Sequence, residues 1–239
     1  GDPAAGPPGS LLLEARGLGS GRSKRAPAIV GGVDLVLAAG TALGITGPNG
    51  AGKSTLALTL GGLLKPVAGT LRAAPALAGT AGPDPARWKS TDLVTRIGTV
   101  FQEPEHQFLA ATVREELAFG PRRTGGTSDA QVAELVNSLA ERLRLTALLD
   151  ANPFTLSGGE KRRLSVATMI ATNPAVLLLD EPTFGQDANT WAELVALLRT
   201  LVADGTAVVS VTHDAEFLAA LGGSTLRVEH GTARAGALL

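Results

Sequence analysis

The sequence contains no cysteine and no tyrosine, and aromatic residues make up only 3% of its 239 residues. The absence of cysteine excludes disulfide bonds and zinc sites with thiolate ligands, and it fits an intracellular protein. Because aromatic rings are so few, the hydrophobic core has to be built from Leu, Val, Ile and Ala.

Long apolar runs and an excess of charge of one sign are also missing. No stretch approaches the roughly 18 consecutive apolar residues that a membrane-spanning helix needs. The formal net charge is −1, which gives no electrostatic reason to expect a nucleic-acid partner. Hydrophobic residues make up 44% and charged residues 18% of the chain. This balance is typical of a folded globular protein, and the length suits one large domain or two small ones.

The first ten residues, GDPAAGPPGS, are rich in Pro and Gly. They lack the basic start and apolar middle of a signal peptide and are typical of a flexible linker. The only methionine is Met169, so we expect a chain that was processed or cut from a longer protein. An artificial start is the alternative. We therefore expect a linker over residues 1–10 and a folded domain over residues 11–239.

Apolar runs bounded by turn residues predict strands, and apolar residues at helical spacing predict helices. The predicted strands cover residues 11–15, 33–37, 42–46, 97–101, 176–179 and 207–211. A helix of about two turns is predicted after Lys53, with a stop at Lys65-Pro66, and further helices over residues 112–119, 129–149 and 191–202. Residues 71–98 show little pattern. Because strands and helices alternate, we expect an α/β fold with a mostly parallel sheet.

The segment GPNGAGKST, residues 47–55, follows a predicted strand and precedes a predicted helix. It fits the pattern G-x-x-x-x-G-K-[ST] and predicts a phosphate-binding loop, although a glycine-rich turn can match by chance. Glycines let successive backbone amides point at one anion, and the helix directs the positive end of its dipole to the same place. The residues expected to bind a nucleoside triphosphate are Asn49, Gly50, Ala51, Gly52, Lys53, Ser54 and Thr55.

Within this loop, two side chains have specific predicted roles. Lys53 is expected to neutralise the β- and γ-phosphates, and Ser54 to offer its hydroxyl to Mg²⁺.

The apolar run LLLDEP, residues 177–182, ends in two acids. Asp180 at the end of the strand can hold Mg²⁺ directly or through water. Glu181 can orient or polarise the attacking water. One carboxylate does both poorly, because metal ligation uses its basicity. By itself the segment is an ordinary turn after a strand, but beside a phosphate-binding loop it indicates a catalytic pair.

The segment LSGGEKRR, residues 156–163, contains a capping box formed by Ser157 and Glu160, which predicts the start of a helix. Gly158 and Gly159 expose backbone amides at that start, which makes a second anion site. A plain helix cap is the alternative. A single nucleotide does not need two such phosphate cradles from the same protein chain. The second cradle can therefore serve the nucleotide of a different subunit.

Two further polar residues follow predicted strands. The amide of Gln102 can reach Mg²⁺ or the attacking water, and His213 can donate a hydrogen bond to the γ-phosphate and sense its loss. Alone, each is more often structural. The candidate catalytic residues are therefore Glu181, His213 and Gln102, and the candidate metal ligands are Ser54, Gln102 and Asp180.

Together and in this order, these segments resemble the ATP-binding cassette (ABC) ATPase family over about residues 11–229. GPNGAGKST matches its Walker A motif, Gln102 its Q-loop, LSGGE its signature, LLLDEP its Walker B motif, residues 184–187 its D-loop and His213 its H-loop. The resemblance implies an α/β fold: a P-loop NTPase core of RecA type with a parallel sheet, an antiparallel β subdomain, and an α-helical signature subdomain over about residues 103–165.

The same resemblance implies ATP hydrolysis with ATP and Mg²⁺, and a second ABC ATPase domain as partner, either an identical copy or a fused or different cassette. The two domains meet head to tail, with each ATP between the Walker A motif of one and the signature of the other. Ser157, Gly158 and Gly159 are then nucleotide-binding residues for the partner's ATP.

A finer resemblance lies in FQEPEHQF, residues 101–108, and TVREELAFGP, residues 112–121, which look like segments of ATPases from energy-coupling factor (ECF) transporters. Those transporters import vitamins or transition-metal ions. The resemblance implies an integral membrane subunit as partner, no nucleic acid, and a peripheral location at the cytoplasmic face of the membrane. It also implies that His106, Gln107, Phe108 and Leu109 contact the membrane subunit, unless Phe108 and Leu109 are core residues.

The alternative is a soluble ABC ATPase that acts on nucleic acid or the ribosome. The chain shows no heptad run like the coiled coil that DNA-repair members insert. A nucleotide kinase or GTPase with the same loop is disfavoured by LSGGE and by the Glu after Asp180.

The sequence departs from the family pattern at two places. Residues 17–25, where the family has an aromatic residue to stack on adenine, contain none, and Arg22 or Arg25 is left to stack weakly. In the D-loop, Gln186 stands where leucine is usual.

Overall fold

The computed structural model describes residues 7–23, 27–101, 107–124 and 127–238. In this part of the chain, nine strands form one sheet in the order β4-β1-β2-β9-β8-β3-β7-β6-β5. The strands are β1 (Leu11–Ser20), β2 (Val30–Ala38), β3 (Ala42–Thr46), β4 (Ala68–Ala73), β5 (Ile97–Val100), β6 (Val176–Asp180), β7 (Ala207–Val211), β8 (Ser224–Glu229) and β9 (Thr232–Leu238).

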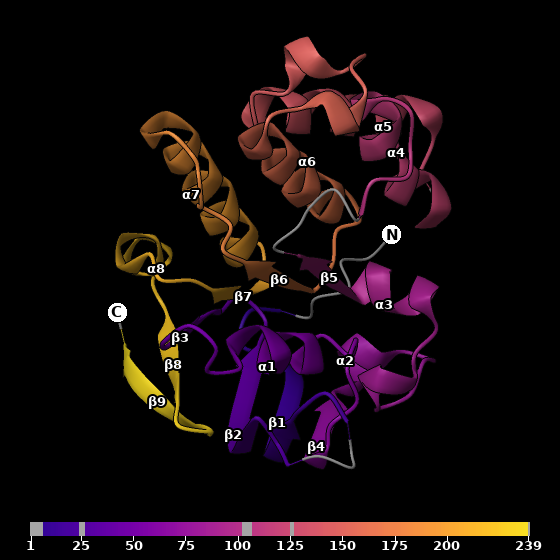
Figure 1. Ribbon diagram of the computed structural model, residues 1–239. Helices are drawn as coiled ribbons and strands as arrows, with labels where there is room; N and C mark the ends of the chain where they lie inside the picture. Colours follow the sequence, from indigo (N-terminus) through magenta and orange to yellow (C-terminus); the bar gives the residue numbers. More distant parts are fainter. Residues whose placement is uncertain (1–6, 24–26, 102–106, 125–126, 239) are drawn as a thin grey trace.

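Helices lie on both sides of this sheet (Figure 1). They are α1 (Lys53–Leu60), α2 (Pro75–Ala78), α3 (Ser90–Arg96), α4 (Val113–Thr124), α5 (Asp129–Arg142), α6 (Gly158–Ala171), α7 (Ala188–Ala203) and α8 (Ala215–Leu221). Short 3₁₀ turns are η1 (Pro85–Arg87), η3 (Thr146–Leu148) and η4 (Pro153–Thr155). No helix in the described ranges combines the length and the apolar character that crossing a membrane requires.

The sheet has a parallel and an antiparallel part. Strands β8, β3, β7, β6 and β5 run parallel to their neighbours, whereas β4, β1 and β2 pair antiparallel, as β9 does with β8. A single parallel pairing, between Gly31 and Thr232, joins the two parts. The predicted α/β fold with a parallel core and an antiparallel β subdomain is confirmed. Because β3, β6 and β7 are parallel, the segments that follow them emerge at the same edge of the sheet.

Strand β6, which lies between β7 and the edge strand β5, is buried on both faces, as its continuous apolar run predicts. Leu177 and Leu179 pack into a core shared with α4–α8, while Val176 and Leu178 pack into a second core with α1, β1 and β2. Since alternate side chains of a strand point to opposite faces, one short strand anchors both cores. The position of Asp180 at its end is therefore fixed from both sides.

The helices α4, α5 and α6 pack together beyond the β5–β6 end of the sheet (Figure 1). Helix α5 begins with a capping box at Ser128, and α6 begins with the one predicted at Ser157. These caps fix where each helix starts, because they satisfy amides that have no partner within the helix.

Several predicted boundaries were wrong. The strands predicted over residues 11–15 and 33–37 are longer, since register shifts in β1 and β2 break the alternation that reveals a strand. Helix α1 ends at Leu60 rather than at Lys65-Pro66, because Gly61 and the left-handed Gly62 follow.

The helix predicted over residues 129–149 stops at Arg142, and Arg144 has a φ of 54°. That left-handed residue turns the chain into the 3₁₀ turn η3. Residues 71–98, which showed little pattern, hold the end of β4, α2, η1 and α3.

Candidate phosphate-binding site

The loop over residues 47–52 takes a shape that only glycine allows at two positions. Gly47 has a φ of 135°, and a Cβ there would collide with the carbonyl oxygen of Val228. Gly52 has a φ of 99°, and its Cβ would lie 2.6 Å from the Cγ2 of Ile29. Residues with a side chain avoid such positive φ values, and neighbouring atoms already fill the space that a Cβ would need. Both positions therefore require glycine.

Helix α1 starts at the end of this loop, with Gly52 as its N-cap. No described side chain caps its first turn, and that turn contains no acidic residue. Its first amides are therefore left without a carboxylate or hydroxyl acceptor, in the positive field of the helix end. This arrangement suits an anion.

Lys53 lies folded over its own loop. Its Nζ donates hydrogen bonds to the carbonyl oxygens of Gly47 (2.8 Å) and Pro48 (2.9 Å). The side chain is buried, and burial lowers the pKa of Lys53, while the nearby carboxylates of Glu181 and Asp180 oppose that shift. A buried ammonium whose hydrogen bonds within the described part of the chain go to two neutral carbonyls is well placed to bind an incoming anion.

Two of the three side chains predicted to hold a magnesium ion are in contact. The hydroxyl of Ser54, in the first turn of α1, hydrogen-bonds the carboxylate of Asp180 at the end of β6. Burial raises the pKa of Asp180, and the Ser54 hydrogen bond, Arg162 and Lys53 only partly offset this. Carboxylate and hydroxyl oxygens side by side are a fitting donor set for Mg²⁺.

Glu181 is held in a strained turn directly after β6. Its φ is 49°, which is uncommon for a residue with a side chain, and its amide donates to the carbonyl of Val211 (2.8 Å). Its Oε2 accepts a hydrogen bond from Thr212 Oγ1 (3.1 Å), and its Oε1 lies 3.7 Å from His213 Nε2.

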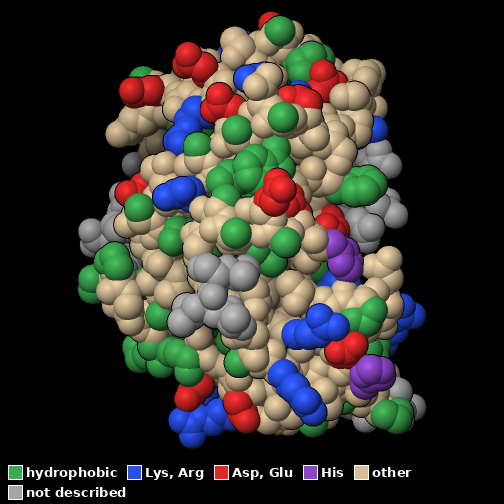
Figure 2. Space-filling model, turned by 90° about the vertical axis from the view of Figure 1, so that its left-hand side faces the viewer, with side chains coloured by type: hydrophobic (Ala, Val, Ile, Leu, Met, Phe, Trp, Pro, Cys, Tyr) green, Lys and Arg blue, Asp and Glu red, His purple; other side chains and the backbone are tan. Residues whose placement is uncertain are grey.

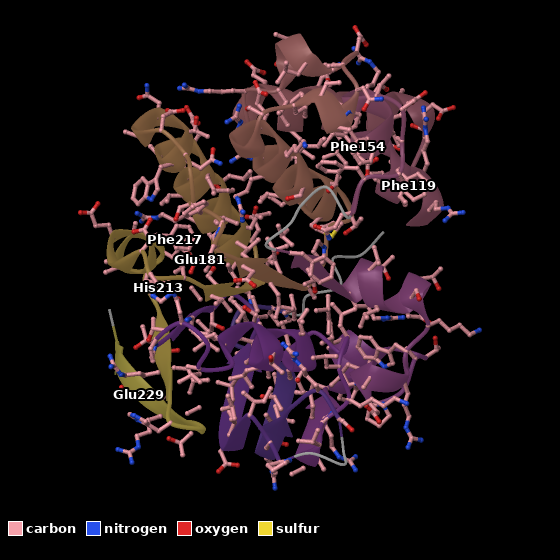
Figure 3. All side chains as sticks on the ribbon, viewed as in Figure 1. Phe119, Phe154, Glu181, His213, Phe217 and Glu229 are labelled. Atoms are coloured by element: carbon pink, nitrogen blue, oxygen red, sulfur yellow. The ribbon has the colours of Figure 1, made fainter. Side chains whose placement is uncertain are left out.

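His213 lies beside Glu181 (Figure 3) and also reaches the phosphate-binding loop. Its Nε2 lies 3.0 Å from Asn49 Oδ1. The end of β7 and the loop after β3 are thus joined through Glu181, His213 and Asn49.

A cavity of about 410 Å³ lies between these elements. From the loop it is lined by Asn49, Gly50, Gly52, Lys53, Ser54 and Thr55, and from the strand ends by Asp180, Glu181 and His213. Ala51 does not line it. Arg22 and Ile29 also line it, and Arg22 belongs to residues 17–25, where the resemblance expects an aromatic residue. Arg25, the other arginine considered there, lies outside the described residues.

The signature residues lie elsewhere in the chain. Ser157, Gly158 and Gly159 begin helix α6 in the helical layer, and none of them lines the cavity. The predicted capping box is confirmed: Glu160 Oε2 accepts from the amide (2.8 Å) and the hydroxyl (2.7 Å) of Ser157. Hydrogen bonds from the Ser157 hydroxyl and then from its amide lower the pKa of Glu160.

Gln102, predicted to act on the metal or the water, lies outside the described residues, as does His106. Of the segment that follows, Phe108 is buried at 6% exposure, whereas Leu109 is 71% exposed. The side chain of Gln107 is turned toward β5, where its Nε2 donates to Thr99 O (2.8 Å). Phe108 is therefore a core residue, and Leu109 is available for a partner.

Three residues that position the candidate site were not predicted from the sequence. Thr212 holds Glu181, as described above. Arg162, buried in α6, donates through one guanidinium nitrogen to the carbonyl oxygens of Asp180 (3.0 Å) and Glu181 (2.9 Å). Asp214 accepts from Thr183 Oγ1 (2.9 Å), Trp191 Nε1 (2.8 Å) and the amide of Phe217 (2.8 Å). Their only sequence signal is adjacency to the motifs, in THD and EKRR.

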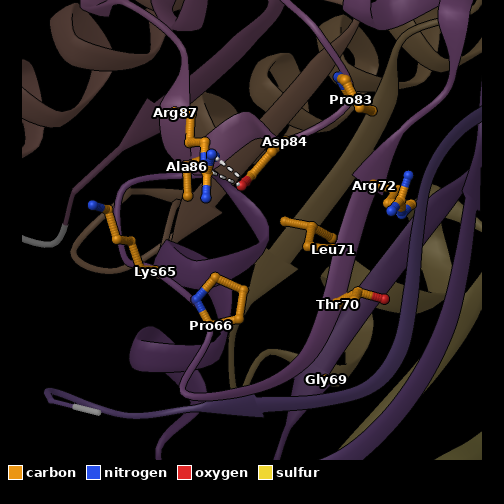
Figure 4. Close-up of a pocket in the computed structure, with 10 residues that line it drawn as sticks. All are labelled: Lys65, Pro66, Gly69, Thr70, Leu71, Arg72, Pro83, Asp84, Ala86 and Arg87. Carbon is orange, nitrogen blue, oxygen red and sulfur yellow. Dashed lines mark hydrogen bonds and ion pairs between the residues drawn. The ribbon is translucent and has the colours of Figure 1, made fainter.

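A second pocket, of about 300 Å³, lies between β4 and the loop that contains η1 (Figure 4). Lys65, Arg72 and Arg87 give it positive charge, but Arg87 already pairs with Asp84 at 3.1 Å. Its ten lining residues include none of the predicted site residues. We therefore place the candidate site in the cavity above α1.

Comparison with known proteins identifies the family. The model of the ABC transporter family matches residues 30–184. The chain belongs to the ABC transporter family. Within it, the cassette is 42% identical over 189 residues to the cobalt import ATP-binding protein CbiO of Rhodobacter capsulatus, covering 79% of this chain and 65% of that protein. It is 35% identical over 207 residues to the energy-coupling factor transporter ATP-binding protein EcfA of Methanothermobacter thermautotrophicus, covering 87% and 64%.

The cassette therefore spans about two thirds or less of the length of these relatives. An import ATP-binding protein of Bacillus subtilis is 40% identical over 95% of this chain, which amounts to 39% of that protein. Among solved structures, CbiO1 of Clostridium perfringens has a TM-score of 0.76 at 26% identity, covering 94% of this chain and 87% of that one. A bacterial ABC transporter cassette solved as a dimer has a TM-score of 0.81 at 25% identity, covering 95% and 99%. These matches confirm the resemblance to the ABC ATPase family that the sequence motifs predict. Proteins of this family are ATPases.

Proposed function

We propose that the cassette hydrolyses ATP to power an ECF-type importer of a vitamin or transition-metal ion, and that two cassettes close head to tail around each nucleotide. The observation that carries the proposal is the division of the site within one chain. The cavity collects the Walker A loop with Asp180, Glu181 and His213, while the glycines of the signature stand outside it. A second cassette can bring its signature to the open side of the cavity.

Gly158 supports this division. Its φ is not in the left-handed region, and a Cβ at this position would meet no atom within 4 Å. Neither its backbone nor its packing in the described part of the chain therefore requires glycine. A requirement from outside the chain, such as the close approach of a nucleotide held by the partner, explains the residue.

The Walker A cavity fits a nucleoside triphosphate with magnesium. The loop lines a cavity of about 410 Å³, a Cβ at Gly50 would meet no atom within 4 Å, and Lys53 can exchange its two carbonyl acceptors for phosphate oxygens. When bound, Mg²⁺ supplies positive charge against the phosphates, and Ser54 and Asp180 would hold it.

Glu181 is the residue we assign to the attacking water. Its carboxylate is fixed by Thr212 and lies near His213. We assign the metal to the preceding residue, Asp180, so the carboxylate of Glu181 is left for the water. It can therefore orient the water and accept its proton. His213, joined to Asn49, is placed to hold the terminal phosphate against this water.

The surface around Leu109 is the proposed contact with an integral membrane subunit. Leu109 is 71% exposed, and Phe154, whose ring packs edge-on against that of Phe108 at 6.1 Å, is 54% exposed. Phe108 thus connects the two residues, since it precedes Leu109 in the sequence and contacts Phe154, and exposed apolar patches are typical of a protein contact. With such a partner the cassette would sit peripherally at the cytoplasmic face of the membrane. The import relatives support this assignment.

Action on nucleic acid has less support. The face that carries α7 and α8 shows Lys and Arg interspersed with Asp and Glu (Figure 2), rather than a surface of one positive sign.

The first experiment uses the purified chain and its Glu181→Gln variant. We expect both to bind Mg·ATP by calorimetry, and the variant to hydrolyse ATP about 10²- to 10⁴-fold more slowly and to accumulate as an ATP-dependent dimer. Hydrolysis by the variant at the wild-type rate, or no magnesium-dependent binding by the wild type, would refute the assignment.

The second experiment tests the importer. Leu109→Glu should abolish co-purification of an integral membrane protein with the tagged chain, whereas Leu63→Glu, at an apolar residue exposed elsewhere, should not. Co-purification of ribosomes or DNA instead of a membrane protein would contradict the proposal.

A further inference from the structure

Gln186, which replaces the usual leucine of the D-loop, makes two hydrogen bonds to the signature helix of the same chain. Its Nε2 donates to the carbonyl of Gly159 (3.3 Å), and its Oε1 accepts from a terminal nitrogen of Arg163 (3.3 Å). The carbonyl of the neighbouring Gly185 lies within 3.5 Å of where a Gly159 Cβ would stand. The D-loop thus lies directly against the first turn of α6.

Arg163 needs the acceptor that Gln186 provides. The guanidinium is partly buried, and its Nε has no hydrogen-bond partner among the described residues. Burial lowers the pKa of Arg163, and the nearby carboxylates of Glu160 and Asp187 oppose this shift. Leucine at position 186 would remove the amide oxygen and leave a second guanidinium nitrogen poorly satisfied, which is costly for a desolvated charge.

Helix α6 therefore holds both ends of the segment that follows β6. Arg162 donates to the carbonyl oxygens of Asp180 and Glu181, at the start of the segment. One residue further along α6, Arg163 bonds Gln186, at its end. A displacement of the segment at one end is transmitted to α6 at the other, because both attachments are made by adjacent residues of a rigid helix.

We propose that Gln186 is a positioning residue that fixes the signature loop to the Asp180–Gln186 segment, so that the signature of each cassette moves with the acidic pair of its own chain. This inference rests on the proposed function, because it assigns to the signature a nucleotide held by the partner. It links the two nucleotide sites of a dimer: the segment that follows the acidic pair of one site sets the position of the signature that serves the other.

The test compares Gln186→Leu with Gln186→Glu, which retains an acceptor for Arg163 but loses the donor to Gly159. We expect Gln186→Leu to lower kcat about tenfold, the effect of losing two hydrogen bonds that orient the signature, with the KM for ATP unchanged within about twofold. Gln186→Glu should lie between this variant and the wild type. Asn137→Leu, which removes an exposed amide on α5, is the matched control and should leave kcat unchanged.

A double-mutant cycle then assigns the effect to the pair. If Gln186 acts through Arg163, the variant with both Arg163→Met and Gln186→Leu should be no slower than Arg163→Met alone. In the Glu181→Gln background, Gln186→Leu should also weaken the ATP-dependent dimer about tenfold, while calorimetry shows unchanged ATP binding by the monomer. Urea unfolding of each variant establishes that it is folded.

The inference is wrong if folded Gln186→Leu keeps the wild-type kcat, if its effect adds fully to that of Arg163→Met, or if it weakens ATP binding by the monomer. Failure of the proposed function has a different signature, since the wild-type chain itself would then neither hydrolyse ATP nor form the ATP-dependent dimer.

Discussion

The chain presents two glycine-rich helix starts, and they are built in opposite ways. Helix α1 begins after Gly52 without a side-chain cap and without an acid in its first turn. Helix α6 begins with a complete capping box, in which Glu160 accepts from both the amide and the hydroxyl of Ser157. The first start leaves its amides to a ligand, whereas at the second the carboxylate of Glu160 already binds the amide and hydroxyl of Ser157.

This difference shows why the two cradles cannot serve as equal anion sites. At α1, Lys53, the proposed magnesium ligands Ser54 and Asp180, and Glu181, which we assign to the water, all line one cavity of the same chain. At α6, the carboxylate of Glu160 binds Ser157 at the start of the helix, beside the amides of Gly158 and Gly159. An anion held elsewhere, by a partner, can reach those amides, but a free anion has little reason to bind there.

The largest expected effect separates the cradles by affinity. Lys53→Ala should weaken ATP binding by the monomeric chain about 10²-fold, because it removes charge-assisted hydrogen bonds to phosphate. Ser157→Ala should leave that affinity unchanged. Calorimetry on both variants, with the exposed Lys65→Ala as control, decides the matter. An equal loss for Ser157→Ala would place both cradles on one nucleotide in one chain and end the distinction.

A second prediction concerns the glycines, where the sign of the stability change should differ. Gly158→Ala should stabilise the free chain by about 0.4–1 kcal/mol, because it restricts the unfolded chain without strain. It should nevertheless lower kcat, on the order of 10²-fold, because its methyl keeps the partner's nucleotide from the loop. Urea unfolding and ATPase assays measure the two effects. Wild-type activity in Gly158→Ala would mean that the open space at this position has no functional use.

The corresponding substitution in the phosphate-binding loop should change the stability in the opposite direction. Gly52→Ala forces a φ of 99° on a residue with a side chain and drives its Cβ toward Ile29. We expect a loss of roughly 1–3 kcal/mol in the free energy of unfolding. A neutral Gly52→Ala would show that the Walker A loop relaxes easily.

A smaller effect is expected from the cap itself. Glu160→Ala removes the reciprocal hydrogen bonds with Ser157 and should cost about 0.5–2 kcal/mol, whereas Glu160→Gln, which can still form a capping box, should cost less. Thermal or urea unfolding of the three proteins measures this. No such carboxylate exists at the first turn of α1.

The smallest effect is the pH dependence of that cap. Because the pKa of Glu160 is lowered by its bonds to Ser157, the folded state binds the proton less tightly than the unfolded state. Its contribution to stability is present above the ordinary glutamate pKa and is lost as the pH falls through the lowered value. The stability advantage of wild type over Glu160→Gln should therefore shrink on acidification. An advantage that grows in acid would contradict the assigned direction.

Much of the site could be predicted because its residues lie in short contiguous motifs. Local composition is enough to indicate three parts of the candidate site: the loop over residues 47–55, the strand end at Asp180 and the capping box at Ser157. The boundaries of helices and strands were harder to predict. Bulges in β1 and β2 interrupt the alternation of apolar and polar residues, and the left-handed conformation of Arg144, just beyond the end of α5 at Arg142, has no signal in the sequence. Leu109 and Phe108 are neighbours in sequence, yet one is exposed and the other buried.

By itself, the sequence determined the candidate chemistry: which loop is expected to bind phosphate, which acids follow a buried strand, and where a helix begins with two glycines. These properties depend on residues within one turn or one strand of each other. Only the tertiary structure decided which of these groups meet. The parallel order of β3, β7 and β6 brings Asn49, His213 and Glu181 together and leaves Ser157 in another layer, because hydrogen-bonded strand order and helix packing depend on contacts between residues far apart in the chain.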